Sequence, residues 1–461
     1  MSYDPLLAEI RFGCGLSPVH APPGSVQDML ERLAGPDHAA ELWPIDGPEV
    51  LMDRQQSFAA LQRQRREAKG DAAQLQRIAK DISALRKAGR AAQLRWFGQS
   101  LRRRIGSEDG FRERLAFFWG DHFTAMGRGA ALKDGTSPYV EGAIRPHLAG
   151  RFADMLKAVT TSPLMLNYLD QASSMGPGSA AAARRKKPGA GLNENLAREL
   201  MELHTLGAGG PYGQKDVTEL AQLLTGFSFT HKQGFVFRTG YAEPGPETVL
   251  GRSYGGEDPA RLDEVLALLE DLAAHPATAQ HLSRKLAVHF VSDTPDLELV
   301  EAMAARYRET DGQLLAVYEA MLSHPAAWQG QGNVKPPVDF IGSSLRALAV
   351  AELPVDKRKH MERFFVRPLR MMGQTWETPD GPNGWPEEDA SWVTPLALAA
   401  RLQWALAIPG QVTGALPDPR QFLTAALGDR APESLRFAAG AAEGRREGIA
   451  LILASPSFQR M

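Results

Sequence analysis

The sequence predicts a mainly α protein, a large multi-helix globular domain with a small β-hairpin, and three observations support this fold class. Apolar residues recur at helical spacing over much of the chain, as Leu262, Val265, Leu266 and Leu269 do. Alternating apolar runs, which indicate strands, are scarce. Prolines directly follow apolar helical runs and mark places where one helix ends and another begins.

The same spacing predicts helices along the whole chain. After Pro276 the pattern restarts with Leu282, Leu286 and Phe290, so we expect two consecutive helices on either side of that proline. Five further segments show helical spacing: 195–206, 216–225, 311–323, 339–351 and 394–407.

The best strand candidate is the stretch GFSFTHKQGFVFRTG. Phe227 and Phe229 alternate with polar residues, a polar turn follows, and Phe235 and Phe237 alternate again. Two short alternating runs around a turn are typical of a β-hairpin.

A serine or histidine followed by proline ends four of the apolar helical runs. The pairs are Ser162-Pro163, His275-Pro276, His324-Pro325 and Ser455-Pro456. Their spacing is uneven, which excludes a solenoid of fixed period. We interpret them as helix corners, with His275 and His324 as capping residues and not as ligands.

Length and composition indicate how the chain is divided. With 461 residues the chain has room for two or three domains or one large one. We expect an N-terminal segment, 1–50, that packs on the core, and a long basic helical segment, 51–105. The main helical domain, 106–461, would carry a flexible loop at 172–191, where small residues lead into a basic cluster.

The basic segment has a composition of its own. From Leu51 to Arg104 it holds fourteen Lys or Arg and four Asp or Glu, with no proline. Leu75, Ile78 and Ile82 are in helical spacing, which predicts one long amphipathic helix or a pair of helices. The cations either form a contact surface for an acidic polymer or face solvent and are balanced by acids elsewhere.

Charge and hydropathy exclude several classes of protein. A formal net charge of -2 gives no general attraction to nucleic acid or to an anionic membrane. No apolar run is long enough to span a bilayer. Asp4 and Glu9 stand where a signal peptide needs basic and then apolar residues, so we expect a cytoplasmic location. The single cysteine, Cys14, excludes an internal disulfide.

The stretch GLNENLARELMELHTLG carries the main catalytic hypothesis. On a helix, Asn195, Glu199 and Glu202 fall within about 60° of one another, with Arg198 beside them. If both glutamates were buried, one would keep its proton near neutral pH, as acid/base catalysis requires. Alternatively, Glu202 pairs with Arg198 on an exposed surface. His204 would lie nearly opposite the carboxylates.

Other residues are candidates with a structural alternative. His122 stands between Trp119 and Phe123 in the sequence and could be catalytic or simply buried. Lys335, before two prolines, could contact an anion or only mark an extended segment. A turn-rich loop, WETPDGPNGWPEEDASW, is either a compact surface loop or a set of stacking faces for a ligand. Its three indoles are those of Trp376, Trp385 and Trp392.

Several long blocks resemble a bacterial family called domain of unknown function 1800. The hallmark is NENLARELMELHTLG followed by YGQKDVTELAQLLTGFSF. Further blocks follow in the same order: RFGCGLSP, FWGDHF, IRPHLAGRFADML, VKPPVDF, MGQTWETPDGPNGWPEEDASWVTP and ASPSFQR. The resemblance implies a helical fold and no established activity. Members are often exported and encoded beside a second family that resembles alkaline phosphatases and sulfatases.

The chain departs from the family pattern in two places. Many members have His-Asn-His where this chain has Gly120-Asp121-His122, and a His-Asp pair and a lysine in the block where Ala242, Glu243 and Glu247 stand here. If the family used a multi-histidine metal centre, this chain would lack two ligands. The remaining candidates would be His122, His147, Glu199, Glu202 and Asp216. No HExxH spacing is present, and we expect no metal and no cofactor.

These observations lead to three functional hypotheses. The first is a carboxylate-dependent hydrolase of a polymer such as a glycan, with Glu199 and Glu202 as the acid/base pair and His122 as a third catalytic residue. Its substrate-binding residues would be Asn195, Arg198, Trp376, Trp385, Trp392 and Lys335. The second is a non-catalytic binding or assembly partner of a phosphatase- or sulfatase-like protein. The third is a metal-dependent enzyme using His122 with the two glutamates.

Neither a phosphate loop, a dinucleotide-binding GxGxxG after a strand, nor a GxSxG elbow is present, which argues against nucleotide chemistry and a serine hydrolase.

Overall fold

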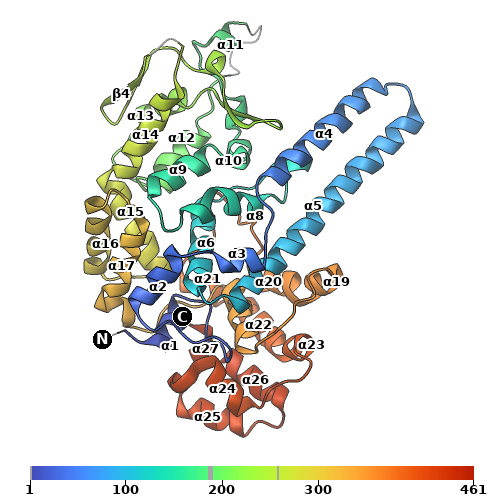
Figure 1. The fold of residues 1–461 in the computed structure, drawn as a ribbon, viewed down its shortest axis with the longest axis vertical. Coiled ribbons are helices and arrows are strands. Elements are labelled where there is room, and N and C mark those ends of the chain that lie inside the picture. Colours follow the sequence, from blue (N-terminus) through green and yellow to red (C-terminus); the bar gives the residue numbers. More distant parts are fainter. Residues whose placement is uncertain (1–2, 185–190, 257–258) are drawn as a thin grey trace.

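The fold is mainly α-helical in a computed structural model that describes residues 3–184, 191–256 and 259–461 (Figure 1). Helices make up 63% of the chain and strands 4%, which confirms the predicted fold class. The described helices surround two hydrophobic cores, and a long helical hairpin projects away from the rest of the molecule.

The N-terminal part places three short helices on the body and then forms the projecting hairpin, which we call the arm. Asp4, Ser25 and Asp37 each accept backbone N–H bonds at the start of one short helix, because a helix leaves its first N–H groups unpaired. The elements are α1 (Pro5–Arg11), α2 (Val26–Ala34), α3 (His38–Leu42), α4 (Glu49–Glu67) and α5 (Ala72–Gly106).

The basic segment therefore folds as a helical pair, the second of the two predicted forms. Ile78 and Ile82 are buried with Ala68 between α4 and α5 and form a small core of their own. The base of α5 belongs to the second core, through Phe97 and Leu101. The arm is thus held at its base and stabilised along its length mainly by its own apolar seam.

The first core is formed by residues between α1 and the short helix that ends at Trp328. Phe12, Trp119 and Phe290 are among its fully buried rings. Its elements after the arm are α6 (Gly110–His122), α7 (Gly129–Leu132), α8 (Thr136–Tyr139), η1 (Val140–Ile144), η2 (Arg145–His147), α9 (Phe152–Thr160), α10 (Pro163–Tyr168), η3 (Gln171–Ser173), α11 (Ala180–Ala183), α12 (Asn195–Glu199), η4 (Leu200–His204), α13 (Gln214–Leu223), β1 (Phe227–Thr230), β2 (Gly234–Phe237), η5 (Thr239–Tyr241), β3 (Pro246–Val249), β4 (Arg252–Gly255), α14 (Leu262–Ala274), α15 (Pro276–Phe290), α16 (Leu297–Glu309), α17 (Leu314–Ser323) and η6 (Pro325–Trp328).

The predicted β-hairpin is confirmed. β1 pairs antiparallel with β2, with Phe227 opposite Phe237 and Phe229 opposite Phe235. A second hairpin, β3 with β4, was not predicted. Its strands, PETV and RSYG, bury a glutamate, Glu247, beside Val249 and Tyr254, so they show no apolar alternation that a sequence pattern could detect.

The predicted helix corners are also confirmed at the two histidines. The side chain of His275 accepts the N–H of Ala277 at 3.0 Å, and that of His324 accepts the N–H of Ala326 at 3.3 Å. Each histidine thus caps the helix that begins at the following proline.

The second core is formed by the base of α5 and the C-terminal helices. Trp404, Phe340 and Ile452 are buried there. Its elements are α18 (Pro337–Ala347), α19 (Arg358–Met361), η7 (Glu362–Val366), α20 (Arg367–Met371), α21 (Asp389–Trp392), α22 (Pro395–Ala407), α23 (Pro409–Val412), α24 (Pro419–Leu427), η8 (Gly428–Arg430), α25 (Glu433–Gly440), α26 (Arg445–Ala454) and α27 (Pro456–Gln459).

Part of the loop expected at 172–191 has regular structure. Residues 171–173 and 180–183 form short helices, and the N–H of Gly176 donates to the carbonyl of Tyr241 at 2.9 Å. Residues 185–190, which include most of the basic cluster, lie outside the described residues. The expected mobility of this loop and the expected division into segments stay predictions.

Among the described residues, no helix combines the length and the apolar content needed to cross a bilayer. The expected cytoplasmic location stays a prediction.

We predict that the double substitution Ile78→Ala and Ile82→Ala opens the arm and leaves the two main cores intact. These side chains fill the small core of the arm, so their loss should raise amide hydrogen exchange over residues 55–90 without changing exchange in α6 or α18. Exchange measured by mass spectrometry tests this. Leu101→Ala in the second core is the control and should destabilise the body by about 2–5 kcal/mol. Loss of protection over the whole chain in the arm variant would contradict the prediction.

Candidate functional site

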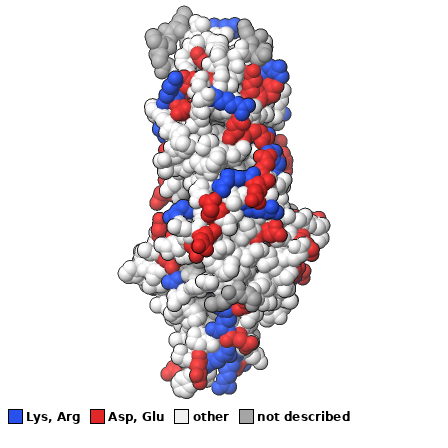
Figure 2. Space-filling view, turned by 90° about the vertical axis from the view of Figure 1, so that its left-hand side faces the viewer, with Lys and Arg blue, Asp and Glu red and all other residues white. Residues whose placement is uncertain are grey.

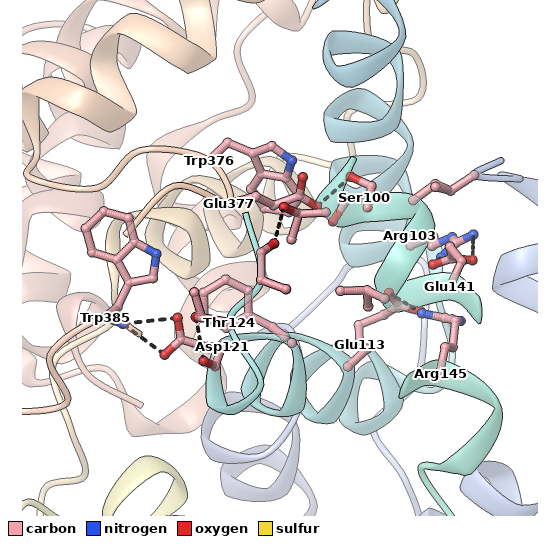
Figure 3. A pocket seen from close by; sticks show the side chains of 18 of the residues that line it. Ser100, Arg103, Glu113, Asp121, Thr124, Glu141, Arg145, Trp376, Glu377 and Trp385 are labelled. Atoms are coloured by element: carbon pink, nitrogen blue, oxygen red, sulfur yellow. Dashed lines mark hydrogen bonds and ion pairs between the residues drawn. The ribbon is translucent and has the colours of Figure 1, made fainter. Parts of the chain in front are cut away.

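Three hollows meet at one loop, residues 376–392, which we call the tryptophan loop. The acid cavity, of about 80 Å³, lies beneath its start and is lined by Asp121, Glu377 and Trp385 (Figure 3). The loop groove, of about 590 Å³, runs along its second half. The basic groove, of about 820 Å³, lies between the start of the loop, α5 and α20. Trp376 and Trp385 each border two of these hollows.

Asp121 fixes the middle of the tryptophan loop from the last turn of α6. The backbone N–H of Trp385 donates to both carboxylate oxygens of Asp121, at 3.0 Å each (Figure 3). Burial and the charge of Glu387 raise the pKa of Asp121 to about 7, against the opposing effects of the Trp385 N–H and Lys285. Asp121 can therefore hold a proton near neutral pH.

The pKa of Glu387 is displaced in the opposite direction from that of Asp121. Burial alone would raise its pKa, but His289, with which it forms a hydrogen bond, and the cations Lys285 and Arg114 lower it below the ordinary value. Burial is also the main effect on Lys285 and lowers its pKa, while Glu387 and Asp121 oppose that effect. The two carboxyls therefore both interact with the Lys285 ammonium group and prefer different protonation states.

The hydrogen bonds of His289 define its tautomer. Arg114 Nη2 lies 3.3 Å from Nε2 of His289, and a guanidinium can only donate, so Nε2 accepts. The ring proton is then on Nδ1, which donates to the carboxylate of Glu387 at 2.9 Å. The imidazole thereby joins α6, α15 and the tryptophan loop.

Glu377 lies at the start of the loop in an unusual conformation. Its φ is 54°, a left-handed value that is uncommon for a residue with a side chain. Ser137 donates to one carboxyl oxygen, while the other is buried and has no hydrogen-bond partner. Burial raises the pKa of Glu377 to about 8 despite the Ser137 bond. The acid cavity thus holds two carboxyls, Asp121 and Glu377, that tend to be protonated.

Around the acid cavity the charges are paired. Arg103 binds Glu141 at 2.7 Å, and Arg145 binds Glu113 (Figure 3). Because their opposite charges are satisfied, these residues form a fixed polar wall, and Asp121 and Glu377 are the carboxyls of this cavity that have no ion pair among the described residues.

Glu199 and Glu202 lie together on the surface of α12 and η4, as the helical spacing predicts. Both are half-buried. Neither carboxylate has a hydrogen-bond or ion-pair partner among the described residues. Burial, together with the charge of Glu202, raises the pKa of Glu199. Neither glutamate lines any of the three hollows at the tryptophan loop.

The neighbours of these glutamates play structural roles. Arg198 pairs with Glu194 at 3.1 Å and also donates to Gln214 on α13, so its carboxylate partner is Glu194 and not Glu202. Asn195 is exposed at the start of α12. The helix containing the glutamates is therefore joined to α13 by Glu194.

His122 supports the end of that same helix. Its Nε2 lies 3.3 Å from the carbonyl of His204, and Nε2 of His281 lies 3.1 Å from the carbonyl of Leu203. The last turn, η4, is a π turn, whose carbonyls lack partners within the helix, so the two imidazoles satisfy them. Burial, with the nearby Lys285, lowers the pKa of all three histidines, to about 3 for His204 and about 4 for His281. They therefore stay neutral at physiological pH.

The other predicted binding residues are divided between the loop and the interior. Trp385 and Trp392 line the loop groove with ring centroids 6.3 Å apart, and Trp376 lies against Phe97 at 4.7 Å. Lys335 is buried with its Nζ 3.9 Å from the ring centroid of Phe458. Burial, opposed in part by Asp339, lowers the pKa of Lys335 to about 7.

No set of three or more His, Cys, Asp or Glu residues is placed to hold a metal ion in the part of the chain that the structure describes. Asp216 accepts the N–H of Gly213 at the start of α13 and that of Leu250 at 2.8 Å, which explains it as a helix cap. His147 is half-buried in η2. The expected absence of a metal and a cofactor stays a prediction.

Comparison with known families supports the resemblance in the sequence blocks. A family model described as protein of unknown function (DUF1800) matches residues 12–460. The chain belongs to this family. No curated protein and no solved structure matches the chain. Membership of the DUF1800 family therefore gives no reaction, and the chemistry must be argued from the site.

Three residues of the site, Lys285, Glu377 and Glu387, were not predicted from the sequence, and Asp121 stood out there only as a departure from the family pattern. Asp121 and Trp385 are 264 positions apart, and His289 and Glu387 are 98 apart. The acids of the loop were visible, but their partners could not be inferred over such separations.

We predict that Asp121→Asn makes stability less dependent on pH between pH 5 and pH 8. The pKa of Asp121 is raised from 3.8 to about 7 by folding, so over this range the folded protein keeps a proton that the unfolded chain has released. Stability from this group therefore falls as pH rises through the window. Asparagine has no such proton. Between pH 5 and pH 8 the variant should therefore lose less stability than the wild type does, by on the order of 2 kcal/mol.

Urea unfolding at the two pH values measures this difference. Asp380→Asn, an exposed carboxyl in the same loop, is the control and should follow the wild type. Equal pH dependence for Asp121→Asn and wild type would show that Asp121 is already ionised at pH 5.

Proposed function

We propose that this member of the DUF1800 family is a hydrolase of a polymeric substrate such as a glycan, with acid/base chemistry at Asp121 and Glu387. The observation that carries the proposal is that Asp121 on α6, which binds the N–H of Trp385, and Glu387 on the same tryptophan loop have pKa values displaced in opposite directions. Carboxyl pairs with such split environments perform the acid and base roles in glycoside hydrolysis.

In this proposal each residue has a defined task. Asp121, protonated near neutral pH, donates its proton to the oxygen of the leaving group as the bond to the polymer breaks. Glu387, ionised, accepts a proton from the attacking water. His289, with Lys285, holds Glu387 ionised, while the partly exposed Trp385 ring in the loop groove provides a flat apolar face for a sugar ring.

Glu199 and Glu202 remain the second carboxyl pair that could perform this reaction. Their helix also places two acids side by side, and the pKa of Glu199 is raised. These two glutamates line none of the three hollows at the tryptophan loop, whereas Asp121 lines the acid cavity and Glu387 lines the loop groove, which favours Asp121 and Glu387 instead. Comparing variants of the two pairs separates the assignments.

A second candidate function is binding to or assembly with a phosphatase- or sulfatase-like protein. It is favoured by three exposed leucines at i, i+4 and i+8 on α22, Leu398, Leu402 and Leu406, which are 39%, 49% and 40% exposed, because adjacent exposed apolar side chains often mark a protein interface. Size-exclusion chromatography of the chain mixed with such a purified protein tests this, with Leu402→Asp expected to reduce co-elution.

We predict that Asp121→Asn and Glu387→Gln each lower the turnover of a polysaccharide by about 10²–10⁴-fold, because each removes one proton-transfer group. Release of reducing ends from a panel of soluble polysaccharides measures turnover, and circular dichroism checks folding. Glu298→Gln, an exposed acid on α16, should retain wild-type turnover.

The same assay applied to Glu199→Gln and Glu202→Gln decides between the pairs. Normal turnover in these two variants, with loss of turnover in the Asp121 and Glu387 variants, supports catalysis at the tryptophan loop. The reverse result moves the chemistry to α12, and no turnover of any polymer by the wild type would count against a glycan hydrolase.

A further inference from the structure

The basic groove has two helical walls and one end at the tryptophan loop. One wall is α5 near the base of the arm, where Leu94 and Phe97 form the apolar floor. The other wall runs through α19, η7 and α20. Trp376 closes the end and also borders the acid cavity, so the groove leads to the candidate catalytic region.

The charges that line this groove are strongly unbalanced. Five cations face it: Arg90, Lys359, Arg363, Arg367 and Arg370. The acids in its lining are Asp134 and Glu362, and Glu362 is already paired with Arg358 at 2.9 Å. None of the five cations has an ion pair with an acid in the part of the chain that the structure describes.

The arrangement of these cations has an energetic cost within the protein. Arg363, Arg367 and Arg370 follow one another at i, i+4 and i+7, a spacing at which like charges on a helix repel. η7 is a π turn, an irregularity that is frequent at functional sites. By contrast, the face of the molecule turned to the viewer in Figure 2 carries acidic and basic side chains intermixed. An external anion would remove the repulsion in the groove.

The arm continues the basic surface beyond the groove. On α5, Arg86 lies four residues and Lys87 three residues before Arg90, which places both one turn farther along the same side. Both are exposed. A ligand that used these cations as well would have to be extended, so a polymer fits better than a small anion.

Neutral polar and aromatic groups indicate the chemistry of that polymer. Thr375, Thr378 and Gln93 offer hydroxyl and amide groups, and Trp376 offers one indole with a buried Nε1 that has no hydrogen-bond partner. Proteins that hold single-stranded nucleic acid usually stack successive bases on several aromatic side chains. One indole among hydroxyl-binding groups and cations suits a sugar chain with acidic substituents.

We propose that the basic groove binds an anionic polysaccharide, one that carries carboxylate or sulfate groups, and holds it where it reaches the tryptophan loop. The inference rests on the proposed function, because it names the substrate class of that hydrolase. Arg363, Arg367 and Arg370 contact the acidic groups, and Trp376 lies against a sugar ring at the end of the groove.

Binding of polygalacturonate to the full chain tests the proposal. The same polymer with its carboxyls methyl-esterified is the matched ligand, since it keeps the backbone and loses the charge. Isothermal titration calorimetry at low salt should show binding of polygalacturonate at least about tenfold tighter than of the ester, with affinity that falls as salt rises.

A triple variant, Arg363→Gln, Arg367→Gln and Arg370→Gln, should weaken binding of polygalacturonate about tenfold or more, because three exposed charge contacts are lost. The matched control removes three exposed cations from the other end of the molecule: Arg184→Gln, Lys215→Gln and Lys232→Gln. The control should bind as the wild type does. Equal weakening in both variants would show attraction by overall charge alone and would overturn the proposal that the groove is the binding site.

Three further outcomes test this inference, and the first of them separates it from the proposed hydrolysis. The Glu387→Gln variant should still bind polygalacturonate, so binding without hydrolysis in the wild type would refute the enzyme and leave the binding groove. Tighter binding of a single-stranded DNA of matched charge than of polygalacturonate, lost in the groove variant, would overturn the polysaccharide and assign the groove to nucleic acid. Equal binding of polygalacturonate and its methyl ester would also overturn the proposal.

Discussion

The relative position of the two cores depends on one buried carboxylate, that of Asp339, and on its contacts with two arginines. This carboxylate binds Arg104 at the base of the arm, and its second oxygen lies 3.6 Å from Nε of Arg114 on α6. All three side chains are buried where the first core meets the second. A buried carboxylate between two guanidinium groups is tolerated only while all partners are present, so the three helices have one mutual position.

The same contact positions the candidate site. Arg114 reaches from Asp339 to His289, which in turn donates to Glu387 on the tryptophan loop. Asp121, seven residues beyond Arg114 on α6, receives the N–H of Trp385 from the same loop. The loop has little regular structure, so its conformation is determined by these charged contacts more than by backbone pairing. Ligand sites commonly lie at such junctions between structural units.

What could be predicted from the sequence follows from how local each signal is. Helical periodicity identified the main helices, and alternation around a turn identified the hairpin at Phe227, because both patterns lie within a few residues of one another. The caps at His275 and His324 are equally local. The π turn η4 was not visible, because it shifts the helix by one hydrogen bond without changing its apolar spacing.

Because only local signals can be read from the sequence, the tryptophans of the candidate site could be predicted, but its carboxyl pair could not. The three tryptophans stand close together in the sequence, so a turn-rich loop with three indoles could be predicted directly, either as a compact surface loop or as stacking faces for a ligand. The pKa of Asp121 depends on Glu387 and Lys285, which are distant in the chain, and on burial that no residue pattern reports. Glu199 and Glu202 were chosen because helical spacing shows which acids are neighbours, but it does not show which acids line the hollows at the tryptophan loop.

The position of the basic groove beside the acid cavity explains how a small cavity could serve a large substrate. A cavity of about 80 Å³ cannot enclose a polymer, so most of the binding energy must come from contacts elsewhere. Contacts remote from the reacting bond can offset the cost of orienting it, provided that a rigid path connects the two places. Trp376 borders both the basic groove and the cavity, and its ring lies against Phe97 of the second core. A polymer held by the arginines would thus be positioned against α5, which packs on α6, the helix that carries Asp121.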